Sequence, residues 1–341
     1  GKVSDNVGRS SGLVKAAPGG ISTVAGDKSS PTVGDVWYNS STGKLRTYIA
    51  ANAWSAGGDL GTARNSAMGF GIKSAAAVAG GNHPALGTTE EYDGSSWSAG
   101  GNTGVDAHGH SAAGLQTAGI KSSGYTSDYQ AGSEIYDGSA WSSITNLPGN
   151  RYESGSLGTQ TAYGTFCGAT TSGGSSTSDT MDIWNGSSWA TGGTTNQAGH
   201  YVTGCGTTSA GLKVGGLFPT NTVVDDVEEY NGTDWTAVPN YPAVRSHLMV
   251  GGLQTDAMSV GGTTDNSSTY LQTAYTYDGT NWTSVTNYPI ECIMGGISRN
   301  DATASDNTLV WGGTDHTISP SAKTVKTYHW LGTGTLSIST E

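Results

Sequence analysis

The chain has 341 residues and contains 54 Gly, 42 Ser and 46 Thr, so these three residue types make up about 42% of it. This composition excludes long helices, because Gly, Ser and Thr all disfavour the interior of a helix. The ten Trp and sixteen Tyr exclude a disordered chain, because aromatic side chains in such numbers build hydrophobic cores. The net charge of −12 opposes binding to nucleic acid. We therefore expect an all-β protein without a nucleic-acid partner.

Two further classes are excluded by simple counts. No apolar stretch approaches the roughly 20 residues that a membrane-spanning helix needs, so we expect no membrane insertion. Three cysteines, Cys167, Cys205 and Cys292, are an odd number without short spacings. This pattern predicts three free, buried thiols rather than a zinc site or a disulfide framework.

The first recognisable element lies at residues 34–58. It contains Gly34-Asp35-Val36-Trp37-Tyr38-Asn39, then Gly43-Lys44-Leu45-Arg46, and leads into Tyr48 and Trp54. We predict a small three-strand module at 34–58, preceded by an extended connector at 1–33 and followed by the main domain at 59–341. The module resembles one that is common in tail-fibre and other virion proteins of bacteriophages.

The main domain is built from an internal repeat, which is searched for before any other feature. Its clearest marker is an aromatic residue, Asp-Gly or Asn-Gly, and a Trp, with the second aromatic recurring after 44, 48, 46 and 47 residues. The five copies begin and end at Tyr92 and Trp97, Tyr136 and Trp141, Trp184 and Trp189, Tyr230 and Trp235, and Tyr277 and Trp282. Asp-Gly and Asn-Gly between aromatic residues predict a tight hairpin in which both turn residues take positive φ. We expect the five repeated Trp side chains to be largely buried between neighbouring units.

Glycines mark the other strands of each unit. A pair ending in Gly precedes each hairpin, at Gly80-Gly81, Ser123-Gly124, Cys167-Gly168, Gly215-Gly216, Gly261-Gly262 and Gly312-Gly313. Another Gly lies ten residues before the second member in five units, at Gly71, Gly114, Gly158, Gly206 and Gly252. Each unit thus predicts four short strands, and six such units predict a six-bladed β-propeller, with a seventh, partial blade left open. The strand at Trp54 or the one from Thr335 to Thr340 is expected to complete the last sheet.

These glycine pairs and aromatic residues resemble the repeats of the kelch family over roughly residues 60–330. The resemblance implies a propeller around a central channel, with interaction surfaces on the loops of one face. A propeller scaffold does not by itself define a function, because it serves enzymes, adaptors and lectins.

One register supplies the candidate ligand-binding residues. Aligned on the first-strand Gly, three arginines fall seven residues before it and two histidines one residue away, which gives Arg64, His108, Arg151, His200 and Arg245. The kelch resemblance implies that this register lies at one mouth of the channel. The alternative is that these side chains bind neighbouring blades and have a structural role.

The repeated carboxylates are expected to be structural. Glu90, Glu134, Asp182 and Glu228 each lie two residues before the turn aromatic. A catalytic pair needs two carboxylates that face one substrate, whereas a propeller spreads equivalent positions around its circumference. The acidic patch at residues 225–229 has no calcium-loop spacing.

No catalytic signature emerges either, because the HExxH and Walker motifs are missing from the sequence. We therefore predict no catalytic residues, no metal, no cofactor and no enzymatic activity.

The remaining features favour adhesion. Hydroxyls, amides and aromatic faces recognise sugars, and seven tyrosines outside the turn register could supply such faces. They are Tyr125, Tyr129, Tyr152, Tyr201, Tyr241, Tyr270 and Tyr288, although the Tyr241 and Tyr288 linkers also suit packing between blades.

We predict a virion-surface, extracellular fibre domain that binds a host-surface glycan through one propeller face. It would attach to other virion proteins through its N-terminal segment, and it would form a homo-oligomer, preferably a trimer. A passive structural or decorating role and a glycan-active propeller enzyme are the alternatives.

Overall fold

The computed structural model describes residues 21–29, 32, 34–81, 85–171, 176–218, 221–265, 269–300, 304–305, 307–318 and 322–338. Two compact units are present: Gly1–Ala53 with Leu331–Glu341, and Trp54–Trp330. The described residues form strands, turns and bends but no helix, which confirms the all-β prediction. Most of the predicted connector, residues 1–20, 30, 31 and 33, lies outside the described residues.

Among the described residues, the first unit contains two complete strands and parts of two longer strands that continue into the second unit. β1 (Ser22–Val24) pairs in parallel with β2 (Val36–Asn39), which pairs in antiparallel with β3 (Lys44–Ala56). The side-chain oxygen of Asn39 accepts hydrogen bonds from the amides of Ser41 and Thr42, each at 3.1 Å. An Asn that binds the backbone two and three residues ahead stabilises a turn, and this turn connects β2 to β3.

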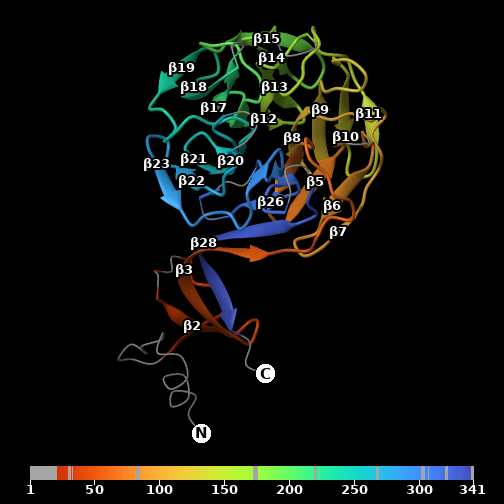
Figure 1. Cartoon of the computed structure of the whole chain (residues 1–341). Coiled ribbons are helices and arrows are strands. Elements are labelled where there is room, and N and C mark those ends of the chain that lie inside the picture. The colour runs from red at the N-terminus through yellow and green to blue at the C-terminus, as the bar shows by residue number, and fades with distance from the viewer. Residues whose placement is uncertain are drawn as a thin grey trace. The chain divides into compact units, whose positions relative to one another are not determined.

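The second unit is a propeller, and Figure 1 shows its sheets arranged in a ring. Five sheets each contain four antiparallel strands that are neighbours in both sequence and space. We call them blades one to five, and their strands are as follows: β4 (Gly69–Ile72), β5 (Ala75–Ala79), β6 (Thr89–Tyr92), β7 (Trp97–Ala99); β8 (Ser111–Leu115), β9 (Ala118–Ser122), β10 (Ser133–Tyr136), β11 (Trp141–Ser143); β12 (Gly155–Thr159), β13 (Ala162–Phe166), β14 (Thr180–Trp184), β15 (Trp189–Thr194); β16 (Thr203–Thr207), β17 (Ala210–Phe218), β18 (Thr222–Tyr230), β19 (Trp235–Val238); β20 (Met249–Leu253), β21 (Asp256–Val260), β22 (Ala274–Tyr277), β23 (Trp282–Val285).

Blade six joins both ends of the propeller sequence. Its strands run in the order β25 (Gly296–Ile297), β26 (Leu309–Trp311), β28 (Thr327–Ile338) and β3. The Gly57 amide donates to the Thr327 carbonyl at 2.8 Å, and the Trp54 ring lies 5.1 Å from that of Trp330. The Trp54 end of β3 therefore closes the ring as the outer strand of the sixth blade. Two short strands, β24 (Cys292–Ile293) and β27 (Thr314–Asp315), pair beside it.

Backbone conformation explains the glycine pairs. The first member has φ between 55° and 72° in all six pairs, including Ser123 and Cys167, whereas the second has φ between 88° and 129°. An L-residue can occupy the left-handed region near 60° at a modest cost, but the second range is open only to Gly. Two units can therefore replace the first Gly, while none of the six replaces the second.

The Asp-Gly turn differs from the prediction. Gly94, Gly138, Gly186, Gly232 and Gly279 have positive φ, but the preceding Asp or Asn does not. In blade one Tyr92 pairs with Trp97, so four residues form the loop, and the Asp93 carboxylate accepts the amides of Ser95 and Ser96, each at 2.8 Å. The side-chain caps replace the second left-handed residue, so the predicted two-residue turn is wrong in this respect.

Blade contacts use both aromatics of each repeat. The first aromatic is buried: Tyr92, Tyr136, Trp184, Tyr230 and Tyr277 are at most 4% exposed. Of the Trp residues, Trp235 is buried and the other four are half-buried. Three of the five indole N–H groups donate to a neighbouring blade: those of Trp97, Trp141 and Trp189 bind the Thr327 hydroxyl, the Thr89 hydroxyl and the Thr145 carbonyl at 2.8–2.9 Å. In these three repeats the Trp joins adjacent blades by packing and by a hydrogen bond, whereas Trp235 and Trp282 contribute by packing.

Candidate functional site

The channel is surrounded by six backbone positions in the left-handed region, one from each blade. They are Ser66, Gly109, Glu153, Tyr201, His247 and Met294, with φ between 49° and 62°. The amide of each donates to the carbonyl of the one before it, at distances from 2.8 to 3.5 Å, and the Ser66 amide donates to the Met294 carbonyl. These six hydrogen bonds form a closed circle, which we call the axial ring.

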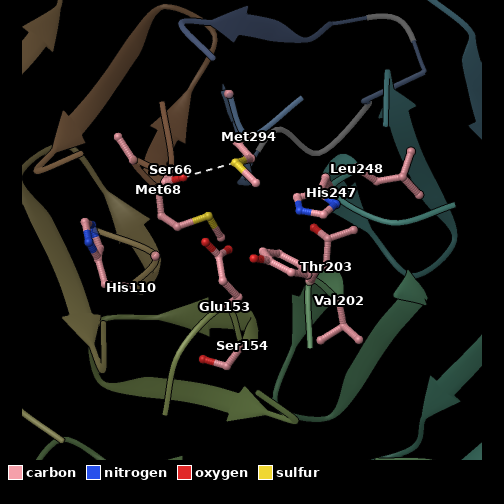
Figure 2. Close-up of a pocket in the computed structure, with 14 residues that line it drawn as sticks. Ser66, Met68, His110, Glu153, Ser154, Val202, Thr203, His247, Leu248 and Met294 are labelled. Carbon is pink, nitrogen blue, oxygen red and sulfur yellow. Dashed lines mark hydrogen bonds between the residues drawn. The ribbon is translucent and has the colours of Figure 1, made fainter. Parts of the chain in front are cut away.

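A small cavity of about 40 Å³ lies beside the axial ring. Figure 2 shows the Glu153 carboxylate, the Met68 sulfur and the His247 ring around its centre. Burial raises the pKa of Glu153 to about 7, and one of its oxygens is buried without a hydrogen-bond partner. Burial lowers the pKa of His247 to about 3. A cavity of this size has room for one or two waters, so it is too small for a sugar.

Arg299 occupies the channel from the side of blade six. It is buried, and its guanidinium donates to the carbonyls of Gly204, at 2.7 Å, and Ser156, at 3.3 Å, in blades four and three. The same group contacts the Met68 sulfur at 3.7 Å. Because the guanidinium binds carbonyls rather than a carboxylate, burial lowers its pKa to about 10. Arg299 thus fills the channel and joins blade six to the opposite side of the ring.

Arg64 and Arg151, two of the predicted binding residues, hold their own blades together. Arg64 is 1% exposed and its Nη2 lies 2.6 Å from the Glu90 carboxylate. Arg151 pairs in the same way with Asp182 at 2.5 Å. Each guanidinium group already binds a carboxylate and two backbone carbonyls within its own blade.

The other two repeated carboxylates bind lysines. Glu134 lies 2.6 Å from Lys121, and Glu228 lies 2.7 Å from Lys213, which also binds Asp226. Each of the four carboxylates thus has a cationic partner, supplied by an Arg before the first strand or by a Lys in the second strand. These pairs agree with the expected structural role, and they account for part of the acidic patch at residues 225–229.

Arg245 differs from the other two arginines. Blade five has Tyr275 where blades one and three have their carboxylate, and the Arg245 guanidinium donates to the Val244 carbonyl at 2.8 Å. The side chain is buried, at 5% exposure.

His108 and His200 belong to aromatic clusters near the axial ring. The His108 ring packs against Tyr125 and Tyr152, with centroids 5.2 and 5.7 Å away, and Tyr129 stacks on Tyr152 at 5.1 Å. His200 packs against Tyr201 at 4.6 Å, and burial lowers its pKa to about 4.

The five predicted residues therefore do not surround one cavity. Three lie in ion pairs or backbone contacts, and two lie in aromatic packing. Of the candidate platforms, Tyr125, Tyr152, Tyr201 and Tyr270 are half-buried and Tyr129 is buried, while Tyr241 and Tyr288 lie inside the blade cores.

A larger cavity lies in blade two. This cavity, of about 500 Å³, is lined by the Lys121–Glu134 pair together with Asp128, Tyr129, Gln130, Asn146 and Asn150. Sequence reasoning identified Tyr129 and Glu134 but not the cavity. The available signal was Ala107, which lines the cavity and stands in the register of Arg64 and Arg151.

Chemical groups that would hold a metal do not gather here. Within the described residues no three His, Cys, Asp or Glu side chains are grouped to bind a metal ion. The described part of the chain also lacks a helix with the length and hydropathy needed to cross a membrane. Comparisons with protein-family models and with curated proteins find no match to this chain.

Proposed function

We propose that the protein is a carbohydrate-binding domain and that the blade-two cavity is its glycan site. The observation that carries this proposal is the lining of that cavity. It is lined by the amide-bearing residues Gln130, Asn146 and Asn150, by Asp128 and by Tyr129. Sugar hydroxyls both donate and accept hydrogen bonds, so they need such mixed amide and carboxylate partners together with an aromatic face.

The binding site thereby moves away from the channel centre. Arg299 fills the channel, and the Arg64 and Arg151 guanidinium groups already hold carboxylates. The volume in blade two is also about tenfold larger than that of the axial cavity, which suits a ligand of one or two sugar rings.

We further propose that this domain acts in adhesion on a virion fibre, outside the cell, and binds a host-surface glycan. The support is the resemblance of residues 34–54 to modules of phage fibre proteins. A single shallow sugar site binds weakly, so presentation as a trimer would raise its effective affinity through multivalency.

A glycan array tests the binding proposal. The wild-type protein should bind at least one glycan, and the variant Asn146→Ala/Asn150→Ala should lose most of that binding. Both side chains are exposed, so the fold should be retained. Asn240→Ala, which removes an exposed amide at the end of blade four, should leave binding unchanged. Binding to no glycan would favour the passive decorating role.

The enzyme alternative is tested in the same experiment. Asp128 and Glu134 both line the cavity, and a pair of carboxylates is what glycoside hydrolysis requires. However, Glu134 accepts the Gly104 amide at 2.7 Å through one oxygen and pairs with Lys121 through the other. We therefore assign Glu134 a structural role, and release of reducing sugar from a bound glycan would overturn this assignment.

A further inference from the structure

The repeat itself indicates what the blade-two cavity was built to hold. In blade one the Arg64 guanidinium lies in a cradle, where it donates to the carbonyls of Gly80, at 2.8 Å, and Thr88, at 3.0 Å, and to the carboxylate of Glu90.

Blade three repeats this cradle closely. There Arg151 donates to the carbonyls of Cys167, at 2.7 Å, and Thr180, at 2.9 Å, and to the carboxylate of Asp182. The same cradle of two carbonyls and a carboxylate therefore occurs in two blades of the chain, and in both blades it surrounds a guanidinium group.

Blade two keeps the cradle without the guanidinium. The equivalent positions are Ser123, Gly132 and Glu134, and Ala107 takes the place of the arginine. All four residues line the cavity of about 500 Å³. The Ala107 side chain ends in a methyl group and donates no hydrogen bond, so the cavity lies where the neighbouring blades carry an arginine side chain.

Gly132 enlarges the same space. Blades one and three have Thr88 and Thr180 there, and the Thr180 hydroxyl accepts from Arg151 at 2.7 Å. A Cβ atom added to Gly132 would meet no atom within 4 Å. The backbone there does not require Gly, since its φ is not in the left-handed region.

Blades two and four both pair their carboxylate with a lysine, but in blade four the equivalent space is filled. Blade four also lacks the arginine, with Gly199 in that register, but the longer strands β17 and β18 cover the position. A Cβ on Gly199 would lie 3.2 Å from the Phe218 ring, and Asp226 supplies a second carboxylate to Lys213.

The charges that line the blade-two cavity favour a cation. Lys121 is paired with Glu134, which leaves the exposed carboxylate of Asp128 as the excess charge of the lining. Tyr129, whose ring stacks on Tyr152 at 5.1 Å, also lines the cavity, and aromatic rings attract cations. A ligand group that carries one positive charge and several N–H donors would satisfy both the carbonyls and this charge.

We propose that the blade-two cavity binds a hydrogen-bond-donating monocation, either a guanidinium or a primary ammonium group. If the ligand is a glycan, as the proposed function states, the cationic group is the free amine of an amino sugar. This part of the proposal rests on the proposed function. The ligand would then supply the cationic hydrogen-bond donor that Arg64 and Arg151 supply in blades one and three.

The first experiment tests the cradle without any glycan. Isothermal titration of the whole chain with methylguanidinium chloride should give saturable binding, whereas tetramethylammonium, a cation without N–H donors, should bind at least about tenfold more weakly, since hydrogen bonds to charged groups contribute about 1.5–3 kcal/mol. Equal binding of the two cations would overturn the proposal.

A variant that copies blade three provides the structural control. Ala107→Arg/Lys121→Thr/Gly132→Thr places the side chains of Arg151, Thr165 and Thr180 in the equivalent positions, and it should abolish methylguanidinium binding while the circular dichroism spectrum is retained. Gly132→Thr is the fallback if the triple variant does not fold. It narrows the cavity without adding a charge, so it should weaken methylguanidinium binding. Ala237→Arg, on exposed β19, adds the same charge elsewhere and should bind as the wild type does. Unchanged binding by the variants in blade two would overturn the proposal.

The glycan arm separates the two proposals. Glucosamine should bind at least about tenfold more tightly than glucose, by the same charged hydrogen bonds. Binding of methylguanidinium but of no glycan would overturn the proposed function and leave the cation site in place. Equal binding of glucosamine and glucose, with no binding of methylguanidinium, would overturn the cation site and leave the glycan site in place.

Discussion

The main-chain amide of Ser66 donates a hydrogen bond to the carbonyl oxygen of Met294 at 2.9 Å, and this bond joins blade one to blade six. It completes the axial ring, in which each blade binds its neighbour through one residue with left-handed backbone. Five of these six residues are not glycines, so each carries a small conformational cost that the ring of hydrogen bonds must offset.

Gly109, the only glycine of the axial ring, gives the first prediction. Gly109→Ala should lower the free energy of unfolding by more than about 1 kcal/mol, because its φ is 62° and the added Cβ would lie 2.2 Å from the Tyr152 ring. Urea denaturation measures the change. Gly132→Ala is the matched control: its Cβ meets open space, so it should be neutral or stabilising by about 0.4–1 kcal/mol. Equal effects of the two changes would contradict the role of the axial ring.

The buried pair of Arg64 and Glu90 gives the second prediction. Arg64→Met should destabilise the fold by about 3–5 kcal/mol, because it leaves the Glu90 carboxylate buried without its cation. Arg64→Met/Glu90→Gln should recover most of this loss, since no uncompensated charge remains. Chemical denaturation of the two variants decides the matter, and a double variant as unstable as the single one would show that packing rather than charge dominates.

Glu153 predicts a pH dependence. Its pKa is about 7 in the folded protein and 4.5 in the reference state, so between these values the folded chain holds a proton that the unfolded chain has lost. Stability therefore falls as the pH rises from about 4.5 to 7. Glu153→Gln removes this loss, and its advantage over the wild type should be small at pH 4.5 and reach about 1–2 kcal/mol above pH 7.

The measurement is a series of unfolding curves from pH 4.5 to 8. The low pKa of His247 acts in the opposite direction, because its neutral form is favoured in the folded state and stability is lost as the pH falls below 6.5. This contribution is common to wild type and variant, so it cancels from their difference. Asp234→Asn, at an exposed carboxylate, should give a difference that does not follow this profile.

Thiol labelling supplies the fourth prediction. Cys167, Cys205 and Cys292 are free and buried, as the sequence predicted. Burial raises the pKa of Cys205 to about 12, so little thiolate exists at neutral pH. A thiol reagent should react slowly with the folded protein and should modify all three residues after denaturation. Rapid labelling of any one of them in the native state would contradict the described packing.

The fold could be predicted because its markers are local. The Gly of each pair, the capped turn and the following Trp are required by backbone conformation at single positions, so they repeat visibly in the sequence. Other markers were present but missed. Gln116, Gln160 and Gln254 each stand two residues after a first-strand Gly, and each donates two hydrogen bonds to carbonyls of the preceding blade.

The candidate site was harder to predict because it depends on what fills a space. Arg64, Arg151 and Arg245 share one register, yet two of them bind carboxylates and the third binds a neighbouring carbonyl. The difference comes from a partner 26 or 31 residues further along, which the register alone does not reveal. The blade-two cavity arises because Ala107 has a small side chain. The sequence alone does not show whether other residues fill the space that a small side chain leaves.

The way in which blade six closes has a consequence for folding during synthesis on the ribosome. Asp59 can form its ion pair only after Lys326, 267 residues later, has been synthesised. The Gly57 amide can likewise bind the Thr327 carbonyl only after that residue has been made. Blades one to five can form as they emerge, because each is made of consecutive strands. The outer strand of the sixth blade stays unpaired until β28 has been synthesised, so a chain stalled on the ribosome before that point would expose an open strand edge that invites aggregation.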